Sequence, residues 1–237
     1  MFRDRSDLLE INYKFEFEDG KSTEFKVFIE PNTLTVVRTI KEPPPEWTKM
    51  ENFQCPHCPL NKDEYKYCPV AVNLKDVISF FSDTPSYENV VVTVETIERT
   101  YIKHTMVQDG VGSLLGILMA SSGCPILSKL RPMVKSHLPF ASIEETEQRV
   151  FSNYLFAQYI KSKNGGTPDW SLEGLKSLYS DIQAINQNIA MKIADLEALD
   201  TSINAVVVLN NFADTVTFSI DEDDLSYYKN LFKGWIE

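Results

Sequence analysis

Near the start of the chain, hydrophobic and polar residues alternate strictly. Apolar side chains occupy every second position from 11 to 17, a period of two that is typical of a β-strand with one solvated face. Asp19-Gly20 is a turn signal, and residues 24–29 continue as a second strand. Pro31-Asn32 predicts another turn, into a third strand at 34–37. We therefore expect the chain to open with an antiparallel meander.

A second group of strands and the first helices follow further along the chain. Asn73 is a candidate cap for a short helix over residues 73–81. Residues 89–96 are rich in β-branched side chains and predict a strand, with another at 99–107. Residues 110–122 are apolar on nearly every side, which predicts a buried central helix.

The remainder of the chain has helical periodicity. Ser142 and Glu145 form a capping-box pattern at the start of a helix over 142–162. A long helix follows residues 168–171, and another covers 203–212. The long helix has apolar residues at intervals of three and four, namely Leu172, Leu175, Leu178, Ile182, Ile185, Ile189, Ile193 and Leu196.

These patterns predict an α+β fold in which an N-terminal antiparallel sheet packs on a C-terminal helical bundle. We expect residues 1–237 to form a single unit, with no clean linker. Within it, residues 1–107 are mainly strands plus a cysteine-rich loop at 41–72, and residues 108–237 form the bundle.

The loop contains six prolines between residues 43 and 69, which exclude a regular helix or a central strand. An irregular segment of that length inside a compact domain needs something to hold it. Cys55, Cys58 and Cys68 lie there with the spacing C-x2-C-x9-C, and Cys124 lies at the end of the predicted central helix. Each cysteine precedes a proline, which restricts the backbone beside it.

This arrangement predicts one metal centre held by Cys55, Cys58, Cys68 and Cys124. Zinc is favoured over an iron–sulfur cluster, because a zinc site needs no assembly machinery and fits a tethered loop. Such an ion is structural, since no coordination position stays open for a substrate. The predicted role is binding or regulation. The alternative is an iron–sulfur or metal-dependent enzyme or redox protein on the same cysteines.

Two other interpretations of the cysteines stay open. Cys124 is also explained as an ordinary buried residue at a helix end, in which case His57 becomes the candidate fourth ligand. Cys55 and Cys58 also have the spacing of a redox pair, although Pro59 and Asn61 make a weak helix start and the βαβ context of such pairs is missing.

His104, His137 and Glu145 are candidates for a second pocket, as a His/Glu metal centre or an acid–base pair. No nucleophile or HExxH spacing accompanies them. Helix-end electrostatics explains Glu145 as the capping-box residue and Glu144 as a first-turn acid. No catalytic residue is assigned beyond this alternative.

Charge and composition restrict the partners. The formal net charge is −11, with no cluster of Lys and Arg, which argues against nucleic acid or an anionic membrane surface. The start of the chain lacks the apolar core of a signal peptide. We therefore expect a cytoplasmic protein, where thiols stay reduced, with a protein or small-molecule partner.

Several short motifs resemble those of an uncharacterised bacterial protein family, a domain of unknown function. They are the CPHCPL sequence at 55–60, YCPV at 67–70, SGCP at 122–125, LRPM at 130–133, HLPFA at 137–141, EET at 144–146 and PDW at 168–170. The resemblance covers about residues 50–210. It implies a bacterial source and one integrated domain, and carries no activity with it.

Overall fold

The computed structural model describes residues 7–38, 42–194, 196, 200–222 and 226–237. Four antiparallel strands form a sheet in the order β2-β1-β3-β4. Their bounds are Leu9–Phe17 for β1, Ser22–Ile29 for β2, Asn89–Glu95 for β3 and Thr100–Met106 for β4. The β1–β2 turn passes through Gly20, whose φ of +85° favours glycine.

The predicted meander is wrong at its third strand. Residues 34–37 contribute only an isolated bridge between Ile29 and Val36. Leu34 has a φ of +54°, which turns the chain, and the Val36 N–H donates to the carbonyl of Ser121 instead of extending the sheet. The sheet is instead extended on the other side of β1, which pairs with β3 from much later in the sequence.

The inner face of the sheet packs on α2 (Pro69–Phe81) and α3 (Val107–Ala120). Phe15 and Val92 on this face are fully buried, and the Phe15 and Phe81 rings lie 5.1 Å apart. Helix α3 approaches the sheet at Gly110, where an added Cβ would lie 2.7 Å from Val92 Cγ2 and 2.8 Å from Phe15 Cε1. Glycine permits this close contact.

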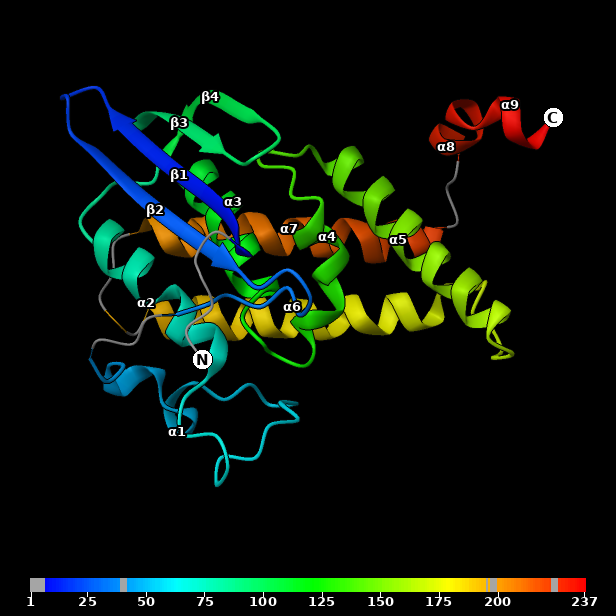
Figure 1. Cartoon of the computed structure of the whole chain (residues 1–237), viewed down its shortest axis with the longest axis horizontal. Helices are drawn as coiled ribbons and strands as arrows, with labels where there is room; N and C mark the ends of the chain where they lie inside the picture. Colours follow the sequence, from blue (N-terminus) through cyan, green and yellow to red (C-terminus); the bar gives the residue numbers. More distant parts are fainter. Residues whose placement is uncertain (1–6, 39–41, 195, 197–199, 223–225) are drawn as a thin grey trace.

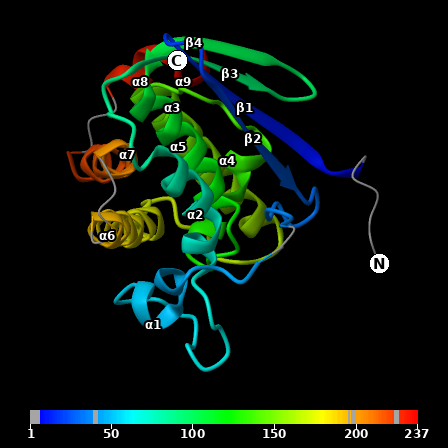
Figure 2. The ribbon, with the colours of Figure 1, turned by 90° about the vertical axis from the view of Figure 1, so that its left-hand side faces the viewer.

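Helices α6 (Glu173–Ala194) and α7 (Asp200–Glu222) form a pair behind α3. Figure 1 shows the pair behind the sheet, and Figure 2 shows the resulting layers of sheet, α2 with α3, and α6 with α7. At Gly112 an added Cβ would lie 3.5 Å from the Ala205 carbonyl oxygen of α7. One contiguous core therefore joins the sheet to both helical layers.

The other helices surround these layers. They are the 3-10 helices η2 (Glu46–Thr48) and η3 (Leu127–Leu130), and the α-helices α1 (Met50–Phe53), α4 (Arg131–Lys135), α5 (Ile143–Lys163), α8 (Ser226–Leu231) and α9 (Lys233–Ile236). Helix α1 and the cysteine loop project from one end of the body, while α8 and α9 lie beyond α5 at the other (Figure 1).

The α+β class and the N-terminal sheet with C-terminal helices are confirmed. The capping box is also confirmed: the Ser142 N–H donates to Glu145 Oε2 at 2.8 Å, and the Glu145 N–H to Ser142 Oγ at 3.2 Å. Asn73, however, is not a helix cap. Its side chain donates to the Leu118 carbonyl at 2.8 Å, and α2 begins earlier, with Pro69 in its first turn.

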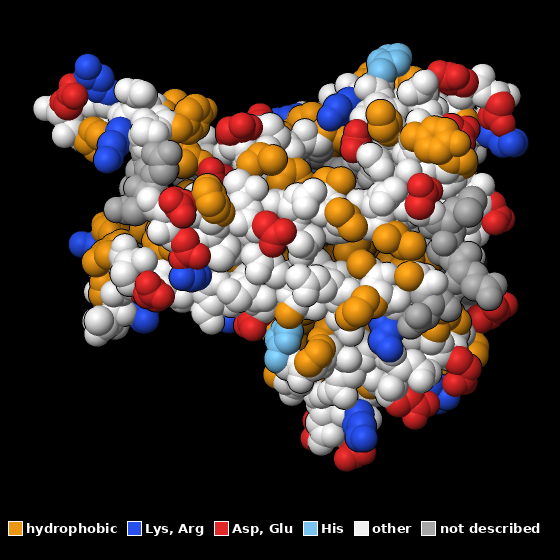
Figure 3. Space-filling view, turned by 180° about the vertical axis from the view of Figure 1, so that it is seen from behind, with side chains coloured by type: hydrophobic (Ala, Val, Ile, Leu, Met, Phe, Trp, Pro, Cys, Tyr) orange, Lys and Arg blue, Asp and Glu red, His pale blue; other side chains and the backbone are white. Residues whose placement is uncertain are grey.

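Helix α7 is longer than the predicted 203–212 and faces outward on one side. It is the one helix in the described ranges that is long and apolar enough to cross a membrane. Length and composition do not separate a membrane span from a packed helix, and α7 packs on α3 and α6 with Ala205 and Val206 fully buried. Seen from behind, hydrophobic side chains are interspersed with polar and charged ones on this side of the molecule (Figure 3).

Candidate functional site

The four cysteines occupy three separate segments. Cys55 and Cys58 follow α1 in a turn closed by the Cys58 N–H on the Cys55 carbonyl, at 3.1 Å. Cys68 is the N-cap of α2, and Cys124 follows α3. All four are free thiols, and all belong to or pack against the hydrophobic core.

The thiols are close enough to influence one another electrostatically. Burial raises the pKa of Cys55 to about 12, and the charges of Cys68, Cys58 and Cys124 add to the effect. Burial likewise raises the pKa of Cys68 to about 11, with added contributions from Cys124 and Cys58. The pKa of Cys124 is raised by burial and then by Cys58. Cys124 is therefore near enough to the loop cysteines for their charges to act on one another.

Backbone amides reach two of the sulfur atoms. The pKa of Cys68 is lowered in part by hydrogen bonds from the Val70 and Ala71 amides, although burial still raises it overall. Amides of Ile126 and Leu127 act in the same way on the pKa of Cys124. These donors favour negative sulfur at both positions.

Neighbouring side chains hold the backbone around the cysteines. Arg38 Nη2 donates to the carbonyls of Pro69 and Ser122, both at 3.1 Å, and so connects the chain beside Cys68 with the chain beside Cys124. Asn188 of α6 contacts Cys55 Sγ at 3.5 Å.

The thiols are not at metal-ligating geometry as they stand: in the described part of the chain, no three His, Cys, Asp or Glu side chains form a group that could hold an ion. His57 Nε2, the other candidate ligand, lies 3.8 Å from Asp181 Oδ1 of α6. The donor set of four soft thiolates nevertheless suits zinc or an iron–sulfur cluster.

The alternative pocket of His104, His137 and Glu145 is not assembled. His104 pairs with Val91, whereas the buried Val90 and Val92 face the helices, so the period of two places His104 on the outer face of the sheet. His137 lies on the opposite, inner side, bonded to Tyr13. Glu145 completes the capping box at the start of α5.

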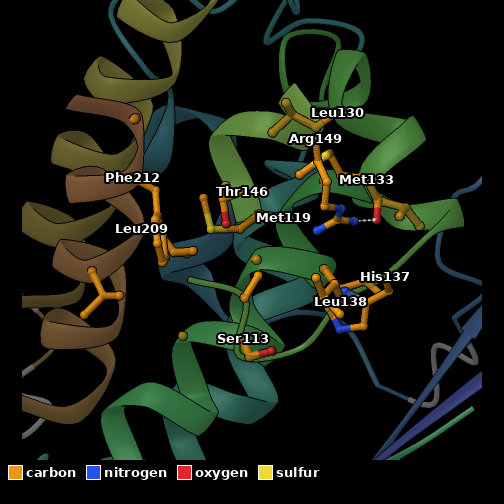
Figure 4. Close-up of a pocket in the computed structure, with 18 of the residues that line it drawn as sticks. Ser113, Met119, Leu130, Met133, His137, Leu138, Thr146, Arg149, Leu209 and Phe212 are labelled. Atoms are coloured by element: carbon orange, nitrogen blue, oxygen red, sulfur yellow. Dashed lines mark hydrogen bonds between the residues drawn. The ribbon is translucent and has the colours of Figure 1, made fainter. Parts of the chain in front are cut away.

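A partly open cavity of about 330 Å³ lies between α3, α4, α5, α6 and α7. Its walls are mainly apolar, with Met119 from α3, Met133 from α4, and Leu209 and Phe212 from α7. Figure 4 shows Leu209 and Phe212 facing the space from one side and Met133 and His137 on the other. A cavity of this size and character is typical of small-molecule binding sites.

Arg149 of α5 lines this cavity (Figure 4) and is one of its two cations, the other being Lys103 of β4. Its Nη2 donates to the Ser136 carbonyl at 2.5 Å and to the Met133 carbonyl at 3.4 Å, near the end of α4. Burial lowers the pKa of Arg149. No carboxylate in the described ranges is within ion-pair distance of it.

A buried polar group of Tyr13, Ser113 and His137 borders the cavity. The Tyr13 hydroxyl lies 2.8 Å from Ser113 Oγ and 2.6 Å from His137 Nε2. Burial raises the pKa of Tyr13 well above 10, and burial together with the charge of Arg149 lowers the pKa of His137 to about 3. The phenol therefore stays protonated and the imidazole neutral. Tyr13 separates Ser113 from His137, so the two do not form a nucleophile–base pair.

Sequence reasoning missed the cavity. Gly112 and Gly116 were informative, because the absence of side chains there lets α7 approach α3 and leaves space beside it. The place of Arg149 in the cavity could not be predicted from sequence, since a single arginine on an amphipathic helix is usually solvated.

A family model for a domain of unknown function, DUF6901, matches residues 11–233. The chain belongs to this family. The match covers the sheet, the cysteine loop and most of the helices, and it confirms that the chain belongs to an uncharacterised family. No curated protein matches the chain, and no solved structure does either.

Proposed function

We propose that the chain binds one zinc ion through Cys55, Cys58, Cys68 and Cys124, and that this ion holds the cysteine loop against the helical core. The observation that carries the proposal is that three segments with four free thiols converge: Arg38 joins the chain beside Cys68 to the chain beside Cys124, and the charges of the thiols act on one another. A small inward movement of the side chains is then required for tetrahedral coordination.

The electrostatics of the thiols supports a cation at their centre. Without one, burial keeps Cys55 and Cys68 protonated at neutral pH, because their pKa values are about 12 and about 11. A divalent cation reverses this preference, because a coordinating thiol loses its proton. The amide donors at Cys68 and Cys124 then stabilise the resulting thiolates.

A metal crosslink would stabilise the cysteine loop, which has little regular structure of its own. Its regular structure in the described residues consists of the short helices η2 and α1 and an isolated bridge between Lys49 and Tyr67. An ion bound to Cys55 and Cys58 on one side and to Cys68 and Cys124 on the other joins the loop to the start of α2 and the end of α3. Its role is structural, since four thiolates leave no open position.

The test is elemental analysis and a visible spectrum of protein purified without added metal. We expect one zinc per chain and no colour. Cys124→Ser should lower zinc to well below one per chain, while Ser202→Ala, a buried change in α7 that removes no described hydrogen bond, should retain it. Circular dichroism of both variants confirms that they are folded.

Other results would redirect the proposal. Iron with visible absorption would indicate an iron–sulfur cluster on the same cysteines. Metal-free protein with four titratable thiols, even after incubation with zinc, would overturn the site. Retention of zinc by folded Cys124→Ser would remove Cys124 from the ligand set.

A further inference from the structure

The cavity has room for a small ligand with an apolar body. At the roughly 30 Å³ that a water occupies in the liquid, its volume of about 330 Å³ corresponds to about a dozen non-hydrogen atoms. Met119, Leu130, Leu209 and Phe212 provide apolar walls from three different segments (Figure 4). An aliphatic chain of about ten carbons has this size.

Arg149 gives the cavity a specific polar requirement. Only its Nη2 donates to the protein in the described residues, and a guanidinium has five N–H donors in a fixed fork. Arg149 is only partly buried, and its pKa is lowered by burial and raised in part by the charge of Glu145. Its Nε and Nη1 groups donate to no described protein atom and are not among the buried unpartnered atoms, so they can donate to a ligand carboxylate that enters the cavity.

The other charged groups that line the cavity leave its net charge positive. Lys103 lines it with Nζ above the Phe140 ring at 5.6 Å, and Asp109 lines it with Oδ2 accepting from Thr105 Oγ1 at 2.6 Å. Two cations and one carboxylate among the lining residues leave one net positive charge, because His137 is neutral; the Glu145 carboxylate lies outside the lining but also acts on Arg149. This local excess stands out in a chain of net charge −11, and it matches a monoanion.

Asn186 of α6 provides a second, independent indication. It lines the cavity, is only 1% exposed, and its Oδ1 has no hydrogen-bond partner in the described part of the protein. Buried amides are normally satisfied. A polar ligand atom, or a water that the ligand retains, would complete the hydrogen bonding of this side chain.

We propose that the cavity binds a medium-chain fatty acid, with its carboxylate on Arg149 and its alkyl chain between α3, α4 and α7. The ligand enters as the free monoanion. The site is separate from the cysteines and does not depend on the proposed zinc.

The experiment compares decanoate with 1-decanol by isothermal titration calorimetry, both below their aggregation concentrations, on the full chain. The two probes have the same chain and differ in charge. We expect wild type to bind decanoate at least tenfold more tightly than decanol, since hydrogen bonds to charged groups are the stronger class. Arg149→Met should lose this preference with little change for decanol, and Arg149→Lys should retain part of it.

Two further variants make the result decisive. Lys135→Met removes an exposed positive charge of α4 outside the cavity lining, so it should keep the preference if Arg149 acts locally. Leu209→Trp fills the cavity from the opposite wall and should weaken both ligands while Arg149 stays in place. The Leu209→Trp variant keeps the proposal testable even if Arg149→Met does not fold. Such a failure would arise because Arg149 donates to the carbonyls of Met133 and Ser136 at the end of α4. Equal affinity of wild type for the two probes, no binding of either, or unchanged binding in folded Leu209→Trp would overturn the proposal.

Discussion

His137 shows how burial sets the chemistry of a single residue. Its Nε2 lies 2.6 Å from the Tyr13 hydroxyl, and the groups that face it are Tyr13 from β1 and Arg149 from α5. Both are protonated at neutral pH, so neither offers a negative charge that would stabilise an imidazolium. The neutral ring instead shares a hydrogen bond with the protonated phenol, and the acid–base candidate becomes part of a structural hydrogen-bond group.

This environment predicts a pH dependence of stability. The pKa of His137 is about 3 in the folded state, below its ordinary value of 6.5. The unfolded chain therefore binds a proton first as the pH falls, and stability is lost from pH 6.5 downward towards pH 3. We expect His137 to account for about 2 kcal/mol lost between pH 6.5 and 5.

The measurement is urea unfolding of wild type and His137→Gln across this pH range. The glutamine amide can still hydrogen-bond to Tyr13 but does not titrate, and contributions of other groups cancel in the difference between the two proteins. Parallel stability curves for the two proteins would contradict the assigned pKa.

At the scale of elements, α3 determines the spacing of the layers. It lies between the sheet and α7, and its glycines face neighbours at different distances. An added Cβ at Gly110 would meet Val92 and Phe15 at less than 3 Å, whereas one at Gly116 would meet only Leu209 Cδ2, at 3.4 Å. Close packing therefore requires a glycine at position 110, whereas position 116 has room for a Cβ.

We expect Gly110→Ala to destabilise the protein by about 1–3 kcal/mol through overpacking. Gly116→Ala on the same helix should be neutral or stabilise by up to about 1 kcal/mol, because alanine is the better helix former. Chemical unfolding of both variants checks this pair. Similar destabilisation by the two substitutions would contradict the expectation that Gly110 is limited by close packing and Gly116 is not.

At the scale of the whole molecule, the cysteine loop contacts the helical core through a few large buried side chains and through Asn188 of α6. On the loop side, the side chains of Met50 and Phe53 are buried in this contact. Trp47 packs on Phe53, with the ring centroids 5.6 Å apart. The proposed zinc adds a crosslink across the same junction. We therefore expect the loop and the core to unfold together when zinc is bound and separately when it is removed.

Fluorescence of Trp47 tests this in a Trp170→Phe, Trp235→Phe background, since both removed tryptophans are exposed. With zinc bound, urea transitions followed by Trp47 and by circular dichroism should coincide. After chelation, the Trp47 transition should move to lower urea. Chelation that leaves both transitions unchanged would show that the loop is held without metal.

The local elements could be predicted because their patterns reside in neighbouring residues. Alternation in β1, the capping box of Ser142 and Glu145, and the apolar stripe of α6 each follow from backbone periodicity and side-chain reach. Asn73 misled because a capping residue and a buried amide look alike in sequence, and only its bond to Leu118 distinguishes them.

Local patterns predicted the α+β class, most elements and the loop that contains Cys55, Cys58 and Cys68. Long-range packing set the pairing of β3 with β1 and placed His104 and His137 on opposite sides of the sheet. It also created the cavity around Arg149. The physical reason is that such contacts depend on how helices and strands pack across long sequence separations, which no local pattern encodes.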